Sequence, residues 1–91
     1  MTSASVRPVD FSEHWNAICL RELAKIEPGW ATGDELSWAV FKQAEVIRGR
    51  TRAVLRRLGE DGIIERFDVR HRGELQDCYL VDPEALRRLA E

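Results

Sequence analysis

The chain has 91 residues and a formal net charge of −2, and its composition is 44% apolar and 33% charged. These values fit one small folded domain and exclude a disordered chain. No apolar run approaches the roughly 20 residues of a membrane-spanning helix. We expect a cytoplasmic protein with a flexible tail over residues 1–9, which lack the apolar stretch of a secretory signal, and one domain over residues 10–91. Cys19 and Cys78 lie in apolar patterns, so we expect them to be buried free thiols.

The first predicted element is an amphipathic helix over about residues 11–26. Asp10 with Glu13, or Ser12 alone, can cap its start, and Pro28-Gly29 ends it. Its apolar positions recur at helical spacing and are Trp15, Ile18, Cys19, Leu23 and Ile26.

A short extended stretch, Trp30-Ala-Thr32, precedes a second helix predicted over about residues 34–44. Thr32-Gly-Asp-Glu35 has the spacing of a capping box, in which Thr32 and Glu35 satisfy each other's backbone amides. Trp38 lies off the apolar stripe, so we expect it to cover a neighbouring element or to form a protein interface. The stripe itself consists of Leu36, Val40, Phe41 and Ala44.

Gly49 predicts a turn before a third helix over about residues 49–61. Gly62 is placed to end that helix in the left-handed conformation. At about 100° per residue, the side expected to face the core carries Thr51, Val54, Leu55 and Leu58. The opposite side carries Arg52, Ala53, Arg56 and Arg57, with Arg48 and Arg50 at the entry to the helix.

Two strand-like runs follow, over about residues 63–70 and 75–81, and His71-Arg-Gly-Glu74 reads as a four-residue hairpin loop between them. The end of the hairpin carries Arg70, His71 and Arg72. Asp82-Pro83 then predicts the capped start of a short final helix over about residues 83–90.

Basic charge is concentrated in the region from the third helix to the hairpin. Residues 48–72 hold eight Arg and four acidic residues, whereas the rest of the chain holds six basic and twelve acidic residues. An acidic protein with this distribution can still present one basic face to a nucleic acid.

Leu55-Arg-Arg-Leu-Gly-Glu-Asp-Gly-Ile-Ile-Glu-Arg66 resembles the end of the recognition helix and the first wing strand of winged helix-turn-helix regulators. Thr32-Gly-Asp-Glu-Leu36 resembles the start of that family's second helix. The resemblance implies an α+β fold with a three-helix core, a C-terminal β-hairpin wing and a short final helix. Leu36 and Leu55 are nineteen residues apart, about one helical turn more than in that family, so we assign no subfamily.

The resemblance also implies how the protein would meet duplex DNA. The third helix would enter the major groove, and the wing would lie on the backbone or in the minor groove. Arginine suits both roles, because its planar fork pairs with guanine and its charge attracts phosphates. The candidate contacts on the helix are Arg48, Arg50, Thr51, Arg52, Arg56 and Arg57, and those on the wing are Arg70, His71 and Arg72.

Other chemistry has little support in the sequence. No pair of His or Cys residues has metal-ligand spacing, and no phosphate-binding glycine loop or oriented nucleophile is present, so we expect no metal, cofactor, small-molecule ligand or enzymatic activity. We expect Trp15, Trp30 and Trp38 to lie in the core or in an interface.

The sequence thus predicts sequence-specific duplex-DNA binding by a transcriptional regulator, of a kind found in phages or mobile elements. We expect a homodimer, for which the first and last helices offer surfaces. Two alternatives stay open: a winged-helix protein–protein interaction module, and a DNA-binding accessory factor in recombination or replication.

Overall fold

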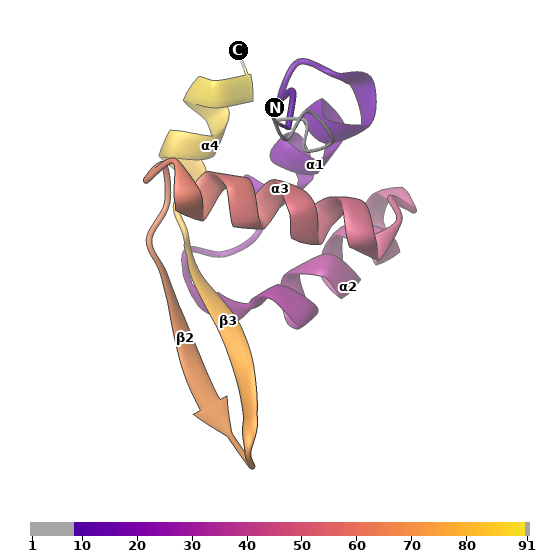
Figure 1. The fold of residues 1–91 in the computed structure, drawn as a ribbon. Helices are drawn as coiled ribbons and strands as arrows, with labels where there is room; N and C mark the ends of the chain where they lie inside the picture. Colours follow the sequence, from indigo (N-terminus) through magenta and orange to yellow (C-terminus); the bar gives the residue numbers. More distant parts are fainter. Residues whose placement is uncertain (1–8, 91) are drawn as a thin grey trace, which may run out of the picture.

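Residues 9–90, which the computed structural model describes, form four helices and three strands of an α+β domain (Figure 1). Of the expected tail, residues 1–8 lie outside this range, and Val9 packs against the core. No helix in the described part is long and apolar enough to cross a membrane. The elements are α1 His14–Leu23, β1 Gly29–Thr32, α2 Gly33–Ala44, α3 Arg48–Glu60, β2 Arg66–His71, β3 Glu74–Val81 and α4 Pro83–Ala90.

Polar side chains set the starts of α1 and α2. Glu13 caps α1, because its carboxylate accepts hydrogen bonds from the amides of Trp15 and Asn16 at 2.6 and 3.2 Å. The helix is therefore shorter at both ends than the predicted 11–26, and Asp10 instead accepts a bond from the Ser12 amide. The predicted capping box between Thr32 and Glu35 is confirmed.

The connection between α2 and α3 differs from the prediction. Glu45 ends α2 in the left-handed conformation, with φ of 57°, and the turn spans Glu45 to Ile47. Ile47 is the N-cap of α3 and makes no side-chain capping bond. Gly49 lies inside the first turn of α3, so the prediction that it forms the preceding turn is wrong.

The end of α3 follows the prediction. Gly62 has φ of 72°, and the amide of Ile63 donates to the carbonyl of Leu58 at 2.9 Å, which is the pattern of a glycine-ended helix. Ile64 then packs into the core, and β2 begins at Arg66 rather than at the predicted residue 63.

The hairpin belongs to a three-stranded antiparallel sheet of order β1-β3-β2. The expected C-terminal two-stranded wing is therefore corrected, because β3 is the central strand of a three-stranded sheet. The expected final helix is confirmed as α4, which follows the hairpin and packs against α1. Arg72 and Gly73 have φ of 52° and 80°, which makes a two-residue turn with both residues left-handed. His71 pairs with Glu74, so the predicted four-residue loop is also wrong.

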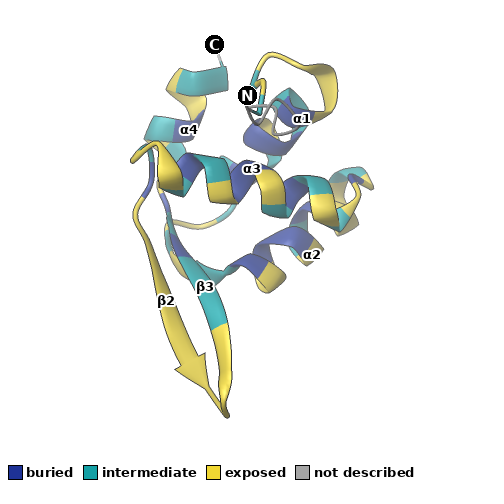
Figure 2. Cartoon of the chain, in the orientation of Figure 1, coloured by how far each residue is buried: buried dark blue, intermediate teal, exposed yellow. Residues whose placement is uncertain are grey.

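The core lies where α1, α2, α3, the base of the sheet and α4 meet, while the far half of the hairpin projects away from it (Figure 2). Trp15 and Phe41 were expected on apolar faces but are 44% and 40% exposed. Trp30 and Trp38 are similarly exposed, so none of the three tryptophans is a core residue. The largest buried side chains include Tyr79, Leu20, Leu23, Leu36, Leu55, Leu58 and Leu86.

Candidate nucleic-acid interface

The inner face of α3 is as expected, and this removes one candidate contact. Val54, Leu55 and Leu58 are fully or almost fully buried. Thr51 also has no exposed surface, and its hydroxyl lies 3.5 Å from the thiol sulfur of Cys19. The Thr51 side chain is buried against Cys19 of α1 and so offers no surface for a contact to DNA.

Arg48, the first residue of α3, is bound to α2 by three contacts. Its guanidinium pairs with Asp34 and donates to the Ser37 hydroxyl at 3.1 Å. It also stacks over the Trp38 ring, 4.1 Å from the ring centroid, in a cation–π contact. We expected Trp38 to cover a neighbouring element, and it contacts α3 through this one arginine.

Arg50 connects α3 to the start of α1. Its Nη1 atom lies 3.1 Å from both the Glu13 carboxylate and the Asn16 side-chain oxygen. Desolvation acts to raise the pKa of Glu13, but the amides of Asn16 and Trp15 and the Arg50 charge outweigh it, so this pKa lies below its ordinary value. Arg50 therefore joins the capping site of α1 and helps to fix α3 against it.

Arg52 lies between α2 and the sheet. Its guanidinium is 3.5 Å from Asp34 and 3.9 Å from Asp77, and Asp77 accepts a 2.6 Å hydrogen bond from the buried Tyr79 hydroxyl. Gly33 permits this arrangement, because a Cβ there would lie only 2.9 Å from the Asp77 carboxylate. The network links β3, the start of α2 and the middle of α3.

The pKa values of this network follow from the same contacts. Desolvation raises the pKa of Asp77, but the Tyr79 hydroxyl, a backbone hydrogen bond and the charges of Arg52 and Arg66 together bring it below the ordinary carboxyl value. Burial, and then the hydrogen bond to Asp77, raise the pKa of Tyr79 well above its usual range. Asp77 is therefore a carboxylate and Tyr79 a neutral donor at neutral pH.

The arginines in the C-terminal half of α3 make fewer contacts to other elements than those at its start. Arg57 pairs with Asp61 at 3.0 Å in an exposed i,i+4 arrangement. Arg56 is exposed, and within residues 9–90 it makes no ion pair, not even with Glu60 four residues further along the chain. An exposed pair contributes only about 0.3–0.5 kcal/mol, so both guanidinium groups can be redirected at little cost.

The hairpin end carries the second group of candidates. Arg70, His71 and Arg72 are all exposed. Arg70 donates to the carbonyl of Gly73 at 3.2 Å, across the turn, and Arg66 pairs with Asp68 at 3.2 Å on the same strand. Arg72 makes no ion pair to the part of the chain that the structure describes.

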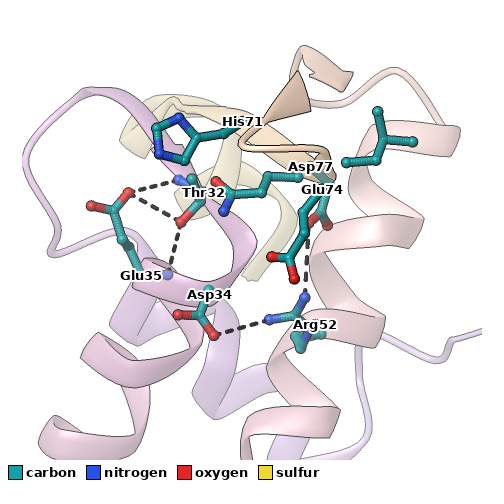
Figure 3. A pocket seen from close by; sticks show the side chains of 9 residues that line it. Thr32, Asp34, Glu35, Arg52, His71, Glu74 and Asp77 are labelled. Carbon is teal, nitrogen blue, oxygen red and sulfur yellow. Dashed lines mark hydrogen bonds and ion pairs between the residues drawn. The ribbon is translucent and has the colours of Figure 1, made fainter. Parts of the chain in front are cut away.

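A hollow of about 610 Å³ lies between α2, α3 and the hairpin, and one residue of each group of candidates lines it (Figure 3). Arg52 of α3 and His71 of the hairpin both line it, so α3 and the hairpin end share one side of the molecule. The lining also includes the four carboxylates of Asp34, Glu35, Glu74 and Asp77. The hollow is therefore lined by both acidic and basic side chains, and the acidic ones are more numerous.

No family model, curated protein or solved structure matched this chain. In the described range, no three His, Cys, Asp or Glu side chains are grouped to hold a metal ion.

The residues of this region that the sequence did not reveal are acidic. Glu13, Asp34 and Asp77 hold Arg50, Arg48 and Arg52, although most of these partners are far apart in the chain. The helical periodicity correctly predicted that Arg52 faces away from the core. It could not predict that carboxylates on other elements lie beside Arg52. One local sign in the sequence, the glycine before two acids in Gly33-Asp-Glu35, indicated that another element approaches the start of α2 closely. That element is β3, through Asp77.

Proposed function

We propose that this protein is a winged-helix domain that binds duplex DNA through α3 and the β2–β3 hairpin, and that it acts as a transcriptional regulator. The order of helices and strands and the resemblance of Leu55–Arg66 to a recognition helix and wing strand support this proposal. The function rests on one observation: Arg52 on α3 and His71 on the hairpin line the same hollow, so both elements can meet one duplex.

The arginines divide into two roles under this proposal. Arg56, Arg57, Arg70 and Arg72 contact phosphates and supply affinity, which depends on salt because phosphate contacts release counterions. Arg48 and Arg52 reach bases or phosphates only after leaving Asp34, and Arg48 must also leave Ser37 and the Trp38 ring. An exposed ion pair costs about 1 kcal/mol or less to break. Counterion release on binding is large enough to drive that exchange.

The test is a salt series of duplex binding. Fluorescence anisotropy with a labelled random-sequence duplex should give an affinity that falls linearly in a log–log plot against salt. Replacing Arg56 and Arg70 by Gln should make the slope shallower by about 2, one for each lost phosphate contact. A duplex unbound at low salt, or a slope that the double variant leaves unchanged, would contradict the proposal.

A matched control exists on the opposite end of the molecule. Arg87 and Arg88 are exposed on α4, which lies far from the hairpin end (Figure 1). Arg87→Gln combined with Arg88→Gln removes the same charge from the protein but should leave the slope unchanged. Selection of bound sequences from a random duplex pool then tests specificity, since a regulator enriches one motif.

A protein–protein interaction module is a second candidate, and a specific observation favours it. Carboxylates already pair with four of the five arginines of α3. The exposed aromatic side chains of Trp38 and Phe41 contact each other on α2 at a centroid distance of 5.8 Å. Exposed aromatics and internally paired charges are features of protein-binding surfaces. The salt series separates the two candidates, because this module would bind no duplex.

A further inference from the structure

The outer edge of β2 offers backbone groups without partners in residues 9–90. β2 is an edge strand, and its six residues pair with β3 in an unbroken register. The amide of Leu80 donates to the carbonyl of Glu65 at 2.9 Å, which sets the phase of the ladder. Because hydrogen-bonded pairs alternate in antiparallel strands, the N–H and C=O groups of Arg66, Asp68 and Arg70 point away from β3.

This edge has charged side chains but lacks the other features that usually prevent strand pairing. β2 contains no proline and no bulge, and all six of its residues are exposed. Its far end projects from the body of the protein, so no helix covers it (Figure 1). Such an edge is a template for a further strand.

We propose that β2 pairs antiparallel with β2 of a second copy of this chain, with Val69 opposite Val69 of the second copy. In this register Asp68 lies opposite Arg70 of the second copy, and the symmetric contact repeats the pair. Phe67 lies opposite His71. Five residues of each strand are then paired, and the outward groups of Asp68 and Arg70 form the inter-strand hydrogen bonds.

The charges along β2 select this arrangement. Arg66, Asp68 and Arg70 alternate in sign on one face of the strand. A register centred on Asp68 would place Asp68 opposite itself and Arg66 opposite Arg70, and like charges directly opposite each other are destabilising. A register centred on Phe67 is also complementary in charge, but it pairs only three residues of β2, Arg66 to Asp68.

The apolar face of the strand supports the same pairing. Phe67 and Val69 lie on the sheet face away from the helices, where Phe67 contacts Trp30 with a centroid distance of 4.5 Å. Pairing covers Val69 and joins the two apolar faces in one six-stranded sheet. The two-fold axis is perpendicular to that sheet, so both α3 helices lie on the same side of it. The strand pair is small, so we expect a reversible, concentration-dependent dimer.

Disulfide trapping tests the pairing and its register. Opposed residues in a non-hydrogen-bonded pair have Cα atoms about 4.5 Å apart, within the range of a disulfide. In a Cys78→Ser background, Val69→Cys should give a cross-linked dimer on mild oxidation, and Phe67→Cys should not. Cross-linking of Phe67→Cys alone would overturn the register. No cross-link, or equal cross-linking of both variants through random collision, would overturn the pairing.

Sedimentation equilibrium tests the charges and the backbone groups without any new thiol. The wild-type mass should rise with concentration from 10.5 kDa towards twice that value. Asp68→Arg should keep the protein monomeric, and adding Arg70→Asp should restore the dimer. Asp68→Pro removes an outward N–H but no bond to β3, so it should give a folded monomer by circular dichroism. A monomeric wild type, or a charge swap that fails to restore the dimer, overturns the proposal.

The inference is independent of DNA binding, because these measurements contain no nucleic acid. A monomeric protein that still binds duplex in a salt-dependent manner would overturn the dimer and leave the proposed function in place.

Discussion

The start of α3 and the end of the hairpin carry the same residue type in different surroundings. Arg48, Arg50 and Arg52 bind carboxylates on α1, α2 and β3, whereas Arg70 and Arg72 extend from an exposed strand and its turn. A count of arginines therefore overstates the charge that a partner can meet. At the start of α3 the cations hold tertiary structure, and on the hairpin they are available for binding.

This difference gives the two regions different sensitivities. A change at the start of α3 should alter the free energy of unfolding, because each arginine there joins two elements. A change on the hairpin should alter binding and leave folding almost unaffected. Four experiments, in order of decreasing expected effect, test that division.

The largest effect is expected where the network of the first region is most buried. Asp77→Ala removes the acceptor of the Tyr79 hydroxyl, and a buried hydroxyl without a partner costs about 1–3 kcal/mol. Urea denaturation should show this loss as a lower midpoint with an unchanged slope. Glu74→Ala, which removes a carboxylate from the hairpin end, should change stability by no more than about 0.5 kcal/mol. Equal losses in the two variants would contradict the division.

A second experiment compares two arginines on the same helix. Arg50→Ala loses the contacts to Glu13 and Asn16 and should lower the free energy of unfolding by about 1 kcal/mol, since the site is only partly buried. Arg56→Ala should stay within about 0.5 kcal/mol of wild type and weaken duplex binding. Thermal unfolding and anisotropy on the same samples measure both quantities. If Arg56→Ala is the more destabilising change, the division of roles is wrong.

Local signals in the sequence predicted those parts of the fold that local interactions determine. The capping box of Thr32 and Glu35 lies within four residues, and Asp82-Pro83 marked the start of α4 at the residue observed. The hairpin turn was missed because Arg72 takes the left-handed conformation there, a position at which Asn, Asp or Gly is the usual signal.

Contacts between distant residues could not be predicted in the same way. Arg50 and Glu13 are 37 positions apart, and Arg48 and Asp34 are 14 apart, so no spacing rule relates them. Phe41 fitted the apolar stripe of its helix, yet 40% of its surface is exposed. Periodicity gives the face of a helix but not the element that packs against it.

The third experiment frees two arginines at the start of α3 from their carboxylate, so that they can bind the duplex. Asp34 pairs with both Arg48 and Arg52, and its carboxylate is 62% exposed. Asp34→Asn removes the charge that holds them, at a cost in stability of about 1 kcal/mol or less. We expect tighter duplex binding, by up to about tenfold, and a steeper salt dependence. An affinity that stays the same would show that these arginines do not reach the duplex.

The smallest effect is expected in the pH dependence of folding. Glu13 and Asp77 have pKa values below those of ordinary carboxyls, so the folded protein binds fewer protons there than the unfolded chain. Their contribution to stability is complete above the unfolded pKa values of about 4 and is lost as pH falls through the lower folded values. Urea denaturation at a series of pH values should therefore show stability declining below about pH 4 to 5. Glu13→Gln removes one titrating group and should make that decline shallower. A decline as steep as that of wild type would show that the amides of Asn16 and Trp15 and the charge of Arg50 do not stabilise the carboxylate of Glu13.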